Sequence, residues 1–131
     1  MAVIIENRHA PAAGFYLQHG QSLRCLDGSI SQGVRLNTCN NNGYQIWAWI
    51  SGNRLQHQQS GRCLDGSISQ GVRLNTCNNN GYQSWHQQTN GYRLQHGQSG
   101  RCLDGSISQG VRLNTCNYDG YQMWLPVRDP A

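Results

Sequence analysis

The sequence predicts an all-β fold with internal threefold symmetry, and three observations support this prediction. A unit of 25 residues recurs almost unchanged over 23–47, 61–85 and 100–124. Charged residues make up only 12% of the chain, whereas Gly, Asn, Gln and Ser are abundant. Short apolar–polar alternations are separated by turn-forming residues, and no segment has the period or caps of a helix. These features together indicate short strands joined by polar turns.

The length of the chain indicates that the repeats form one domain. A chain of 131 residues is typical of a single domain, and a repeat of 38 or 39 residues is too short to hold a core alone. We expect this domain over 15–131, with repeats at about 15–52, 53–90 and 91–131. Residues 1–14 precede the repeats and are interpreted as an added strand or arm covering an edge, or as a mobile tail.

Each repeat reads as four short strands, illustrated here by the second. A Leu-Gln-His strand at 55–57 and a polar turn lead to a strand over 62–65. A loop over 66–71 follows, with Ile68 as its apolar anchor. The third strand, 72–77, places Val and Leu on one side and Arg and Asn on the other. An Asn-Gly turn over 78–81 leads to a fourth strand that begins at Tyr82 and continues beyond Trp85.

Four strands repeated three times give twelve strands with pseudo-threefold symmetry. This is the strand count of a β-trefoil, a six-stranded barrel closed by three hairpins. Burying six apolar side chains per repeat stabilises the fold by roughly 10–20 kcal/mol before conformational entropy is subtracted. The six expected in the second repeat, with counterparts in the others, are Leu55, Leu64, Ile68, Val72, Leu74 and Trp85.

The six cysteines form three pairs whose members are 14 residues apart: Cys25/Cys39, Cys63/Cys77 and Cys102/Cys116. One pairing inside each repeat satisfies all three repeats alike, and closing a loop of about 15 residues contributes roughly 3 kcal/mol. Zinc binding requires closer ligand spacing, so we expect neither a metal nor a cofactor.

Disulfides indicate an oxidising compartment and hence a secreted or extracellularly acting protein. The N-terminus lacks a signal-peptide pattern, which leaves a removed leader, unconventional export or reduced thiols as alternatives.

Charge and composition argue against several classes of partner. The net charge of +4 comes from Arg residues spread evenly along the chain, whereas nucleic-acid binding requires clustered basic residues. No apolar run approaches the roughly 18 residues of a membrane span. Each repeat offers one carboxylate near its motif, whereas acid–base hydrolysis needs two, about 5–9 Å apart. We therefore expect no nucleic-acid binding, no membrane insertion and no enzyme activity, and a monomer or weak dimer.

The motifs Cys63-Leu64-Asp65 and Gln83-x-Trp85 recur in every repeat at the same spacing. With them, residues of about 15 to 125 resemble the ricin B-chain type lectins, which are β-trefoil sugar-binding domains. A single Q-x-W is a weak signal, but three at a fixed period, each preceded by C-L-D, are specific. Within that family the repeated unit is most similar to the actinohivin type of bacterial antiviral lectin, which it matches without gaps.

The resemblance implies a trivalent lectin whose partners are glycans on glycoproteins or on cell or viral surfaces. It also implies four sugar-binding residues per repeat, namely an Asp, an Arg, an Asn and a Tyr. These residues are Asp27, Arg35, Asn40 and Tyr44 in the first repeat, Asp65, Arg73, Asn78 and Tyr82 in the second, and Asp104, Arg112, Asn117 and Tyr121 in the third.

The chemistry of these residue types suits a sugar, and each also has a structural alternative. Asp65 ends an apolar strand beside a Gly-Ser loop, and a carboxylate accepts two hydrogen bonds at once from adjacent hydroxyls. The alternative is an Asx-type turn. Arg73 is otherwise a solvated charge, Asn78 a turn former and Tyr82 a packing residue. The Gln and Trp of each Q-x-W are expected to be structural, with Trp in the core and Gln bonded to buried backbone groups.

The residues around the motif bear on which sugar is bound. Galactose-binding members carry an aromatic residue where this chain has Asn75, and Asn where it has Tyr82. The actinohivin type, which binds α-mannose of high-mannose glycans, shares Tyr82 and Asn78 but has Tyr in place of Arg73. We therefore expect a mannose-type ligand at three working sites. The alternatives are a galactose, GalNAc or acidic-sugar lectin, and a non-sugar trefoil acting as inhibitor or scaffold.

Three histidines also follow the repeat: His19, His57 and His96. Threefold-related imidazoles that met on the axis would form a metal site. The simpler expectation is that they pack at strand ends or face solvent.

Overall fold

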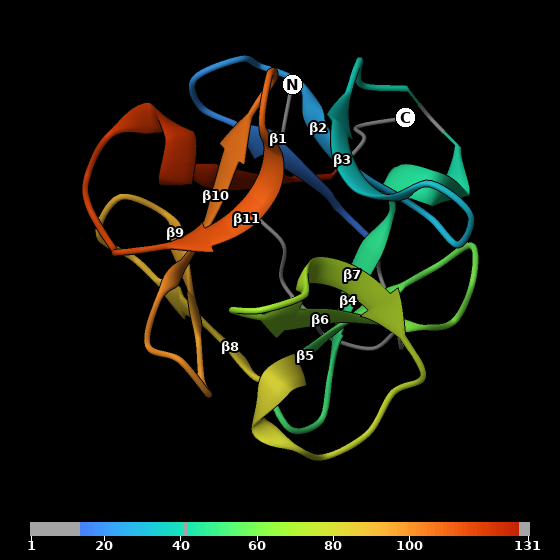
Figure 1. The fold of residues 1–131 in the computed structure, drawn as a ribbon. Helices are drawn as coiled ribbons and strands as arrows, with labels where there is room; N and C mark the ends of the chain where they lie inside the picture. Colours follow the sequence, from blue (N-terminus) through green and yellow to red (C-terminus); the bar gives the residue numbers. More distant parts are fainter. Residues whose placement is uncertain (1–13, 41, 129–131) are drawn as a thin grey trace.

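The computed structural model describes residues 14–40 and 42–128, so the arm expected over 1–14 lies outside them except for Gly14. The described residues form twelve strands whose order repeats three times (Figure 1). The predicted all-β β-trefoil is therefore confirmed. No helix in this part of the chain is long and apolar enough to cross a membrane.

Each repeat contributes four strands and one 3₁₀ turn. The first contains β1 (Tyr16–His19), β2 (Cys25–Ser29), β3 (Gly33–Asn37), η1 (Gly43–Gln45) and β4 (Trp47–Ile50). The second contains β5 (Arg54–His57), β6 (Cys63–Ser67), β7 (Gly71–Asn75), η2 (Gly81–Gln83) and β8 (Trp85–Gln88). The third contains β9 (Arg93–His96), β10 (Cys102–Ser106), β11 (Gly110–Asn114), η3 (Gly120–Gln122) and β12 (Trp124–Val127).

The 3₁₀ turns correct the expected start of the fourth strand. In the second repeat this strand begins at Trp85, and Tyr82 lies in η2 instead. Asn80 forms the N-cap of η2 because its side chain accepts a hydrogen bond from the backbone N–H of Tyr82. A 3₁₀ turn of three residues is too short to leave a periodic pattern in the sequence, which is why the sequence predicted no helical segment.

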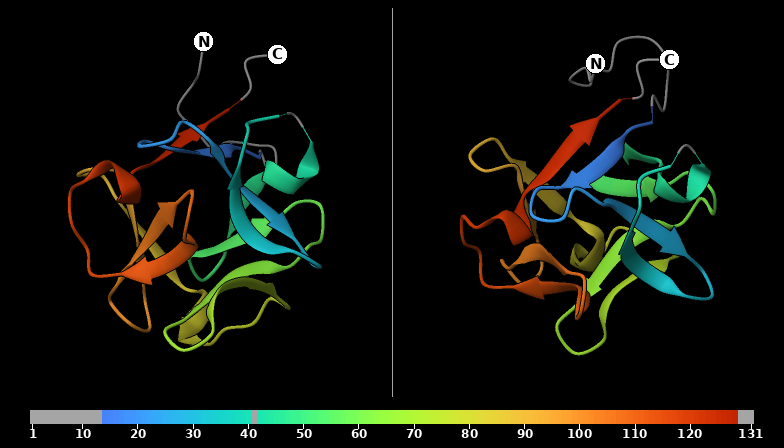
Figure 2. Two further views of the ribbon diagram at one scale, coloured as in Figure 1. Left: turned by 45° about the horizontal axis from the view of Figure 1, so that its top comes forward. Right: turned by 90° about the horizontal axis from the view of Figure 1, so that it is seen from above.

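The twelve strands form three antiparallel sheets of four: β12-β1-β2-β3, β4-β5-β6-β7 and β8-β9-β10-β11. Every sheet therefore combines the last strand of one repeat with the first three of the next. Figure 2 shows β12 beside β1, and in their register Trp124 lies opposite His19. The third strands β3, β7 and β11 contact one another where the three repeats meet.

The shared core is centred on Trp47, Trp85 and Trp124, whose side chains are fully buried. Each indole N–H donates to a carbonyl on the second strand of its repeat, as Trp85 does to Leu64 at 2.9 Å. The predicted core role of the tryptophans is therefore confirmed. The other buried apolar residues of the cluster are Phe15, Leu17, Leu26, Val34, Leu55, Leu64, Leu94, Leu103 and Val111.

The predicted core position of Ile68 is wrong, because 66% of this side chain is exposed. Its counterparts Ile30 and Ile107 are exposed to 65% and 67%. Ile68 follows the last residue of β6 and lies in the turn before β7. The two strands continue to this turn, so the side chain projects beyond the barrel. Val72 and Leu74, on β7, are partly buried, and both pack against the core.

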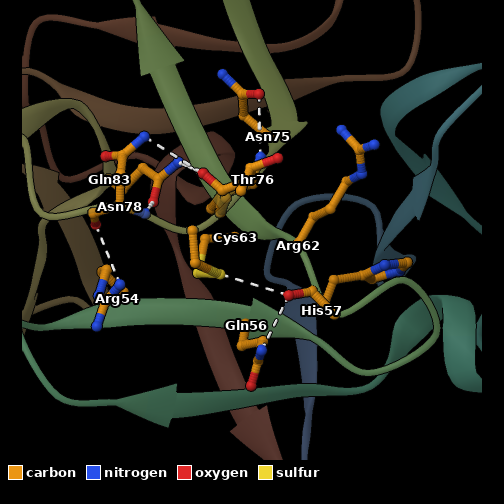
Figure 3. Close-up of a disulfide and its surroundings, with 12 residues drawn as sticks. Arg54, Gln56, His57, Arg62, Cys63, Asn75, Thr76, Asn78 and Gln83 are labelled. Carbon is orange, nitrogen blue, oxygen red and sulfur yellow. Dashed lines mark hydrogen bonds between the residues drawn. A yellow bond between two sulfur atoms is a disulfide. The ribbon is translucent and has the colours of Figure 1, made fainter.

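The three predicted disulfides are present, each within one repeat: Cys25–Cys39, Cys63–Cys77 and Cys102–Cys116. In the second repeat the bond joins the first residue of β6 to the segment that follows β7, with a Cα–Cα distance of 4.9 Å. This disulfide therefore holds the open end of the β6–β7 hairpin together (Figure 3), and the other two disulfides occupy the same place in their repeats.

Candidate functional site

The three repeated aspartates lie inside the protein rather than at its rim. Asp27, Asp65 and Asp104 are each only 2% exposed. Asp65 was expected at the end of a strand beside a loop, but β6 continues to Ser67 and places Asp65 in its middle. Cys63, Leu64 and Gly66 on the same strand are buried as well, so the carboxylate lies in a buried part of β6.

One oxygen of each carboxylate is held by the Gln of the Q-x-W motif. Gln83 Nε2 donates to Asp65 Oδ2 at 2.9 Å and to the Thr76 carbonyl at 2.9 Å. Gln83 Oε1 accepts from the backbone N–H of Asn78 at 2.8 Å. The expectation that this Gln satisfies buried backbone groups is confirmed. Gln45 and Gln122 make the equivalent bonds in the other repeats.

The second carboxylate oxygen faces an arginine. Asp65 and Arg73 lie directly opposite each other on β6 and β7, and Arg73 Nη2 is 3.1 Å from Asp65 Oδ1. This close approach is an ion pair that is not aligned as a hydrogen bond, because Oδ1 is buried and has no hydrogen-bond partner among the described residues. Arg73 Nη1 donates to Gln70, and the arginine side chain is 31% exposed.

The same arrangement recurs in all three repeats. Arg35 lies 3.0 Å from Asp27, and Arg112 lies 3.1 Å from Asp104. Both aspartates again keep an Oδ1 without a hydrogen-bond partner within the described part of the chain. These aspartates therefore do not form Asx turns, and these arginines are not simply solvated charges. Each repeat instead has a buried acceptor beneath a guanidinium that reaches the surface.

The predicted Asn and Tyr positions belong to the turn beside this carboxylate. Asn78 Oδ1 accepts from the Asn80 N–H at 3.1 Å, and Asn78 Nδ2 donates to the Thr76 carbonyl at 3.3 Å. Figure 3 shows Asn78 and Gln83 both directed at Thr76. Asn78 therefore forms this turn, as do Asn40 and Asn117 in their repeats, and its contact with a sugar stays a prediction. Tyr82 follows in η2 with its side chain 42% exposed.

The three histidines connect neighbouring repeats. His96 Nε2 lies 2.8 Å from the Tyr82 carbonyl, and His96 Nδ1 lies 2.8 Å from Ser99 Oγ. Because a carbonyl only accepts, Nε2 carries the hydrogen and Nδ1 accepts from the serine. Burial lowers the pKa of His96, while the Tyr82 carbonyl and the Asp65 charge oppose that shift.

His19 and His57 make the same connections, to the carbonyls of Tyr121 and Tyr44. Burial also lowers the pKa of each of these two imidazoles. The ring nitrogens thus hold the repeats together instead of meeting on the axis. Within 14–40 and 42–128, no three His, Cys, Asp or Glu side chains are grouped so that they could hold a metal ion.

A cavity of about 310 Å³ lies where the second and third repeats meet. We call it the boundary groove. Sequence reasoning missed most of its lining, because it placed Ile68 in the core and sought each site within a single repeat. The signal in the sequence was an isoleucine flanked by serines at a hairpin turn. The groove is lined by Ser67, Ile68, Ser69, Tyr82, His96, Gln98 and Ser99.

Comparison with known proteins identifies a family and solved structures that this chain resembles. Residues 13–124 match the family model described as the ricin-type beta-trefoil lectin domain. A search of curated protein sequences gives no significant match.

Among solved structures, the designed threefold-symmetric protein ThreeFoil is similar, with a TM-score of 0.76 and 26% identity over 88% of this chain and 98% of ThreeFoil. The hemolytic lectin CEL-III has a TM-score of 0.73 and 25% identity over 84% of this chain and 29% of its own. The β-trefoil lectin of the Vibrio vulnificus hemolysin, solved with N-acetyl-D-lactosamine bound, has a TM-score of 0.75 over 91% of this chain and 96% of its own. At 19% identity that last likeness shows the fold alone.

Proposed function

This chain belongs to the ricin-type β-trefoil lectin family, and from that premise we propose that it is a trivalent carbohydrate-binding protein. The observation that carries the proposal is the buried Oδ1 of Asp65, which lacks a hydrogen-bond partner among the described residues. Buried polar atoms normally have hydrogen-bond partners, and Oδ1 of Asp27 and of Asp104 likewise faces an arginine without an aligned hydrogen bond. A sugar hydroxyl would complete each of them.

The neighbouring side chains supply the other contacts that a sugar needs. Gln83 fixes the carboxylate through Oδ2, so that Oδ1 keeps its direction. Arg73 lies over Oδ1 and is one-third exposed, so its guanidinium can move aside and donate to an adjacent sugar oxygen. The exposed ring of Tyr82 offers an apolar face for the C–H surface of a pyranose.

We further propose that the sugar is of the mannose type, as found at the ends of high-mannose glycans. The support is the pairing of Tyr82 with Asn78, which the actinohivin type shares. An acidic sugar is the second candidate, because Arg73 places a cation at the mouth of the site. In both cases the partners would be glycans on glycoproteins or on cell or viral surfaces.

The proposed role is binding rather than catalysis. Each site has a single carboxylate, and Gln83 and Arg73 or their counterparts already engage it. Three disulfides suit an oxidising extracellular environment. Open single sites bind weakly, but three linked sites raise the overall affinity roughly 10²–10⁴-fold when glycan spacing allows simultaneous contact.

Isothermal titration calorimetry with methyl α-mannoside tests this proposal, with an expected stoichiometry of three sugars per chain. The variant D27N/D65N/D104N should lose binding. Asn keeps an oxygen for Gln83 but turns an amide toward the arginine, so the acceptor for the sugar is lost. The matched control is Asp119→Asn, because the other repeats carry Asn at this position.

Agglutination of cells that display high-mannose glycans, together with a glycan array, completes the test. Unchanged agglutination by the triple variant would overturn the carbohydrate proposal. An array on which only galactosides or sialosides bind would reject mannose while retaining the lectin function.

A further inference from the structure

We propose that the boundary groove is a second saccharide subsite, which holds the sugar ring next to the one bound at Asp65, and that the other two junctions between repeats provide the same subsite. This inference rests on the proposed carbohydrate binding and extends it from monosaccharides to the linkage between two sugars. Each complete site would then be formed by residues of two adjacent repeats.

One wall of the groove is apolar and open to solvent. Ile68 is 66% exposed and Tyr82 is 42% exposed, and both line the same cavity. Single exposed apolar residues are common, but a grouped apolar surface beside polar residues marks a binding site. The same two positions are exposed in every repeat. Ile68 would contact the C–H face of the second pyranose, and Tyr82 would lie between the two sugar rings.

The remaining lining is polar and uncharged. Ser67 and Ser69 lie on the same side as Ile68, whereas Gln98 and Ser99 come from the next repeat. Hydroxyls and an amide can both donate to and accept from sugar hydroxyls. The volume, about 310 Å³, lies near the lower end of the roughly 300–1,000 Å³ range of small-ligand sites. The groove therefore suits one sugar ring.

The groove adjoins the aspartate site directly. Tyr82 lines the groove and precedes Gln83, which holds the Asp65 carboxylate. His96 forms the buried floor of the groove, and a Cβ added to Gly66 would come within 3.0 Å of His96 Nε2. His96 therefore packs against Gly66, the residue that follows Asp65. A disaccharide with one ring at Asp65 would extend its second ring past Tyr82.

The close approach that forms this boundary recurs at all three junctions. A Cβ added to Gly81 would lie 2.8 Å from the side-chain oxygen of Gln98. The equivalent distances are 2.8 Å for Gly43 with Gln59 and 2.9 Å for Gly120 with Gln21. The last pair joins the third repeat to the first. The glycines let the glutamine of the next repeat lie against the 3₁₀ turn, so the same contact is made at all three junctions.

The experiment compares methyl α-mannoside with α1,2-, α1,3- and α1,6-linked mannobiose by titration calorimetry. We expect at least one disaccharide to bind the wild-type protein about tenfold more tightly than the monosaccharide. The variant I30S/I68S/I107S should reduce this advantage to about twofold or less and leave methyl α-mannoside affinity unchanged. Replacing the opposite wall with Q21A/Q59A/Q98A should have the same effect.

The matched control is Leu23→Gly. Leu23 is also 66% exposed, lies outside the groove, and occupies a position where the other repeats carry glycine. This variant should keep the full disaccharide advantage.

Three results would overturn the subsite: no disaccharide advantage in the wild type, an unchanged advantage in the isoleucine variant, or an equal loss of both ligands. If methyl α-mannoside does not bind, the comparison uses the methyl glycoside and disaccharides of the sugar that the array selects. Binding of no sugar would overturn the carbohydrate proposal and the subsite together.

Discussion

The Gln83 side chain makes three hydrogen bonds that bring together separate parts of its repeat. Its partners are the Asp65 carboxylate, the Thr76 carbonyl and the Asn78 N–H. One amide therefore joins the second strand, the end of the third strand and the turn before η2. Its bond to Oδ2 holds the Asp65 carboxylate in one orientation.

Replacing Gln83 with Ala should lower the free energy of unfolding by about 2–4 kcal/mol, because buried polar groups lose their partners. Urea denaturation at neutral pH measures the change. Gln87→Ala is the matched control, since Gln87 is exposed on β8, and it should change stability by less than about 0.5 kcal/mol. Similar values for the two variants would contradict the structural role of Gln83.

Residue types alone did not determine burial at this site. Asp65 is charged and yet buried, because Gln83, 18 residues later, and Arg73 on the adjacent strand enclose it. Ile68 is apolar and yet exposed, because it lies at a hairpin turn. The sequence placed the tryptophans correctly because no other side chain in the repeat could fill a core of that size. The Asp65–Arg73 pair was predictable only once the hairpin register was known.

The β6–β7 hairpin carries most of the features of one site. The disulfide closes its base, the Asp65–Arg73 pair lies at its centre, and Ile68 lies at its turn. The disulfide fixes the hairpin at the end away from the groove. Closing the chain there also restricts the unfolded state.

Removing one disulfide, as in C63A/C77A, should lower the free energy of unfolding by about 3 kcal/mol. The other two disulfides span the same sequence separation of 14 residues, so their removal should have an equal effect. Urea denaturation of the three double variants tests this. Losses that differ from one another by more than about 1 kcal/mol would show that native-state contacts, rather than loop length, dominate.

Strands were easier to predict than the elements between them. Alternating residues bounded by turn formers located all twelve strands to within a few residues. The 3₁₀ turns have no periodicity to detect. The turns at 51–53 and 89–91 join the fourth strand of one repeat to the first strand of the next, as the β4–β5 and β8–β9 pairs show, whereas no turn in the sequence indicates the pairing of β12 with β1.

At the scale of the whole molecule, three imidazoles join the repeats into a ring. His19, His57 and His96 each pack against the tryptophan opposite them on the preceding repeat. Each also donates to a tyrosine carbonyl of that repeat. The negative charges of Asp104, Asp27 and Asp65, respectively, act on these rings and oppose the lowering of their pKa.

Stability should fall as the solution becomes acidic. Burial lowers the pKa of all three histidines below 6.5 in the folded protein. The unfolded chain therefore binds more protons below that pH, and stability is complete above about pH 6.5 and is lost as pH falls through the folded-state pKa values. The slope is at most about 1.4 kcal/mol per pH unit for each histidine.

Urea midpoints measured from pH 5 to pH 8 (a range chosen around the ordinary histidine pKa of about 6.5) test this dependence. His57→Gln keeps a donor for the Tyr44 carbonyl but cannot titrate, so the slope should fall by about a third. An unaltered slope in this variant would show that other groups cause the acid sensitivity.

The pairing of β12 with β1 places Trp124 opposite His19, in the same register that joins Trp47 to His57 and Trp85 to His96. The junction between the third and first repeats therefore has the same strand pairing as the two junctions within the chain. A circularly permuted chain, opened between β8 and β9 and joined between β12 and β1, would form the same contacts. Because the three junctions share this register, each repeat makes the same strand contacts with its neighbours.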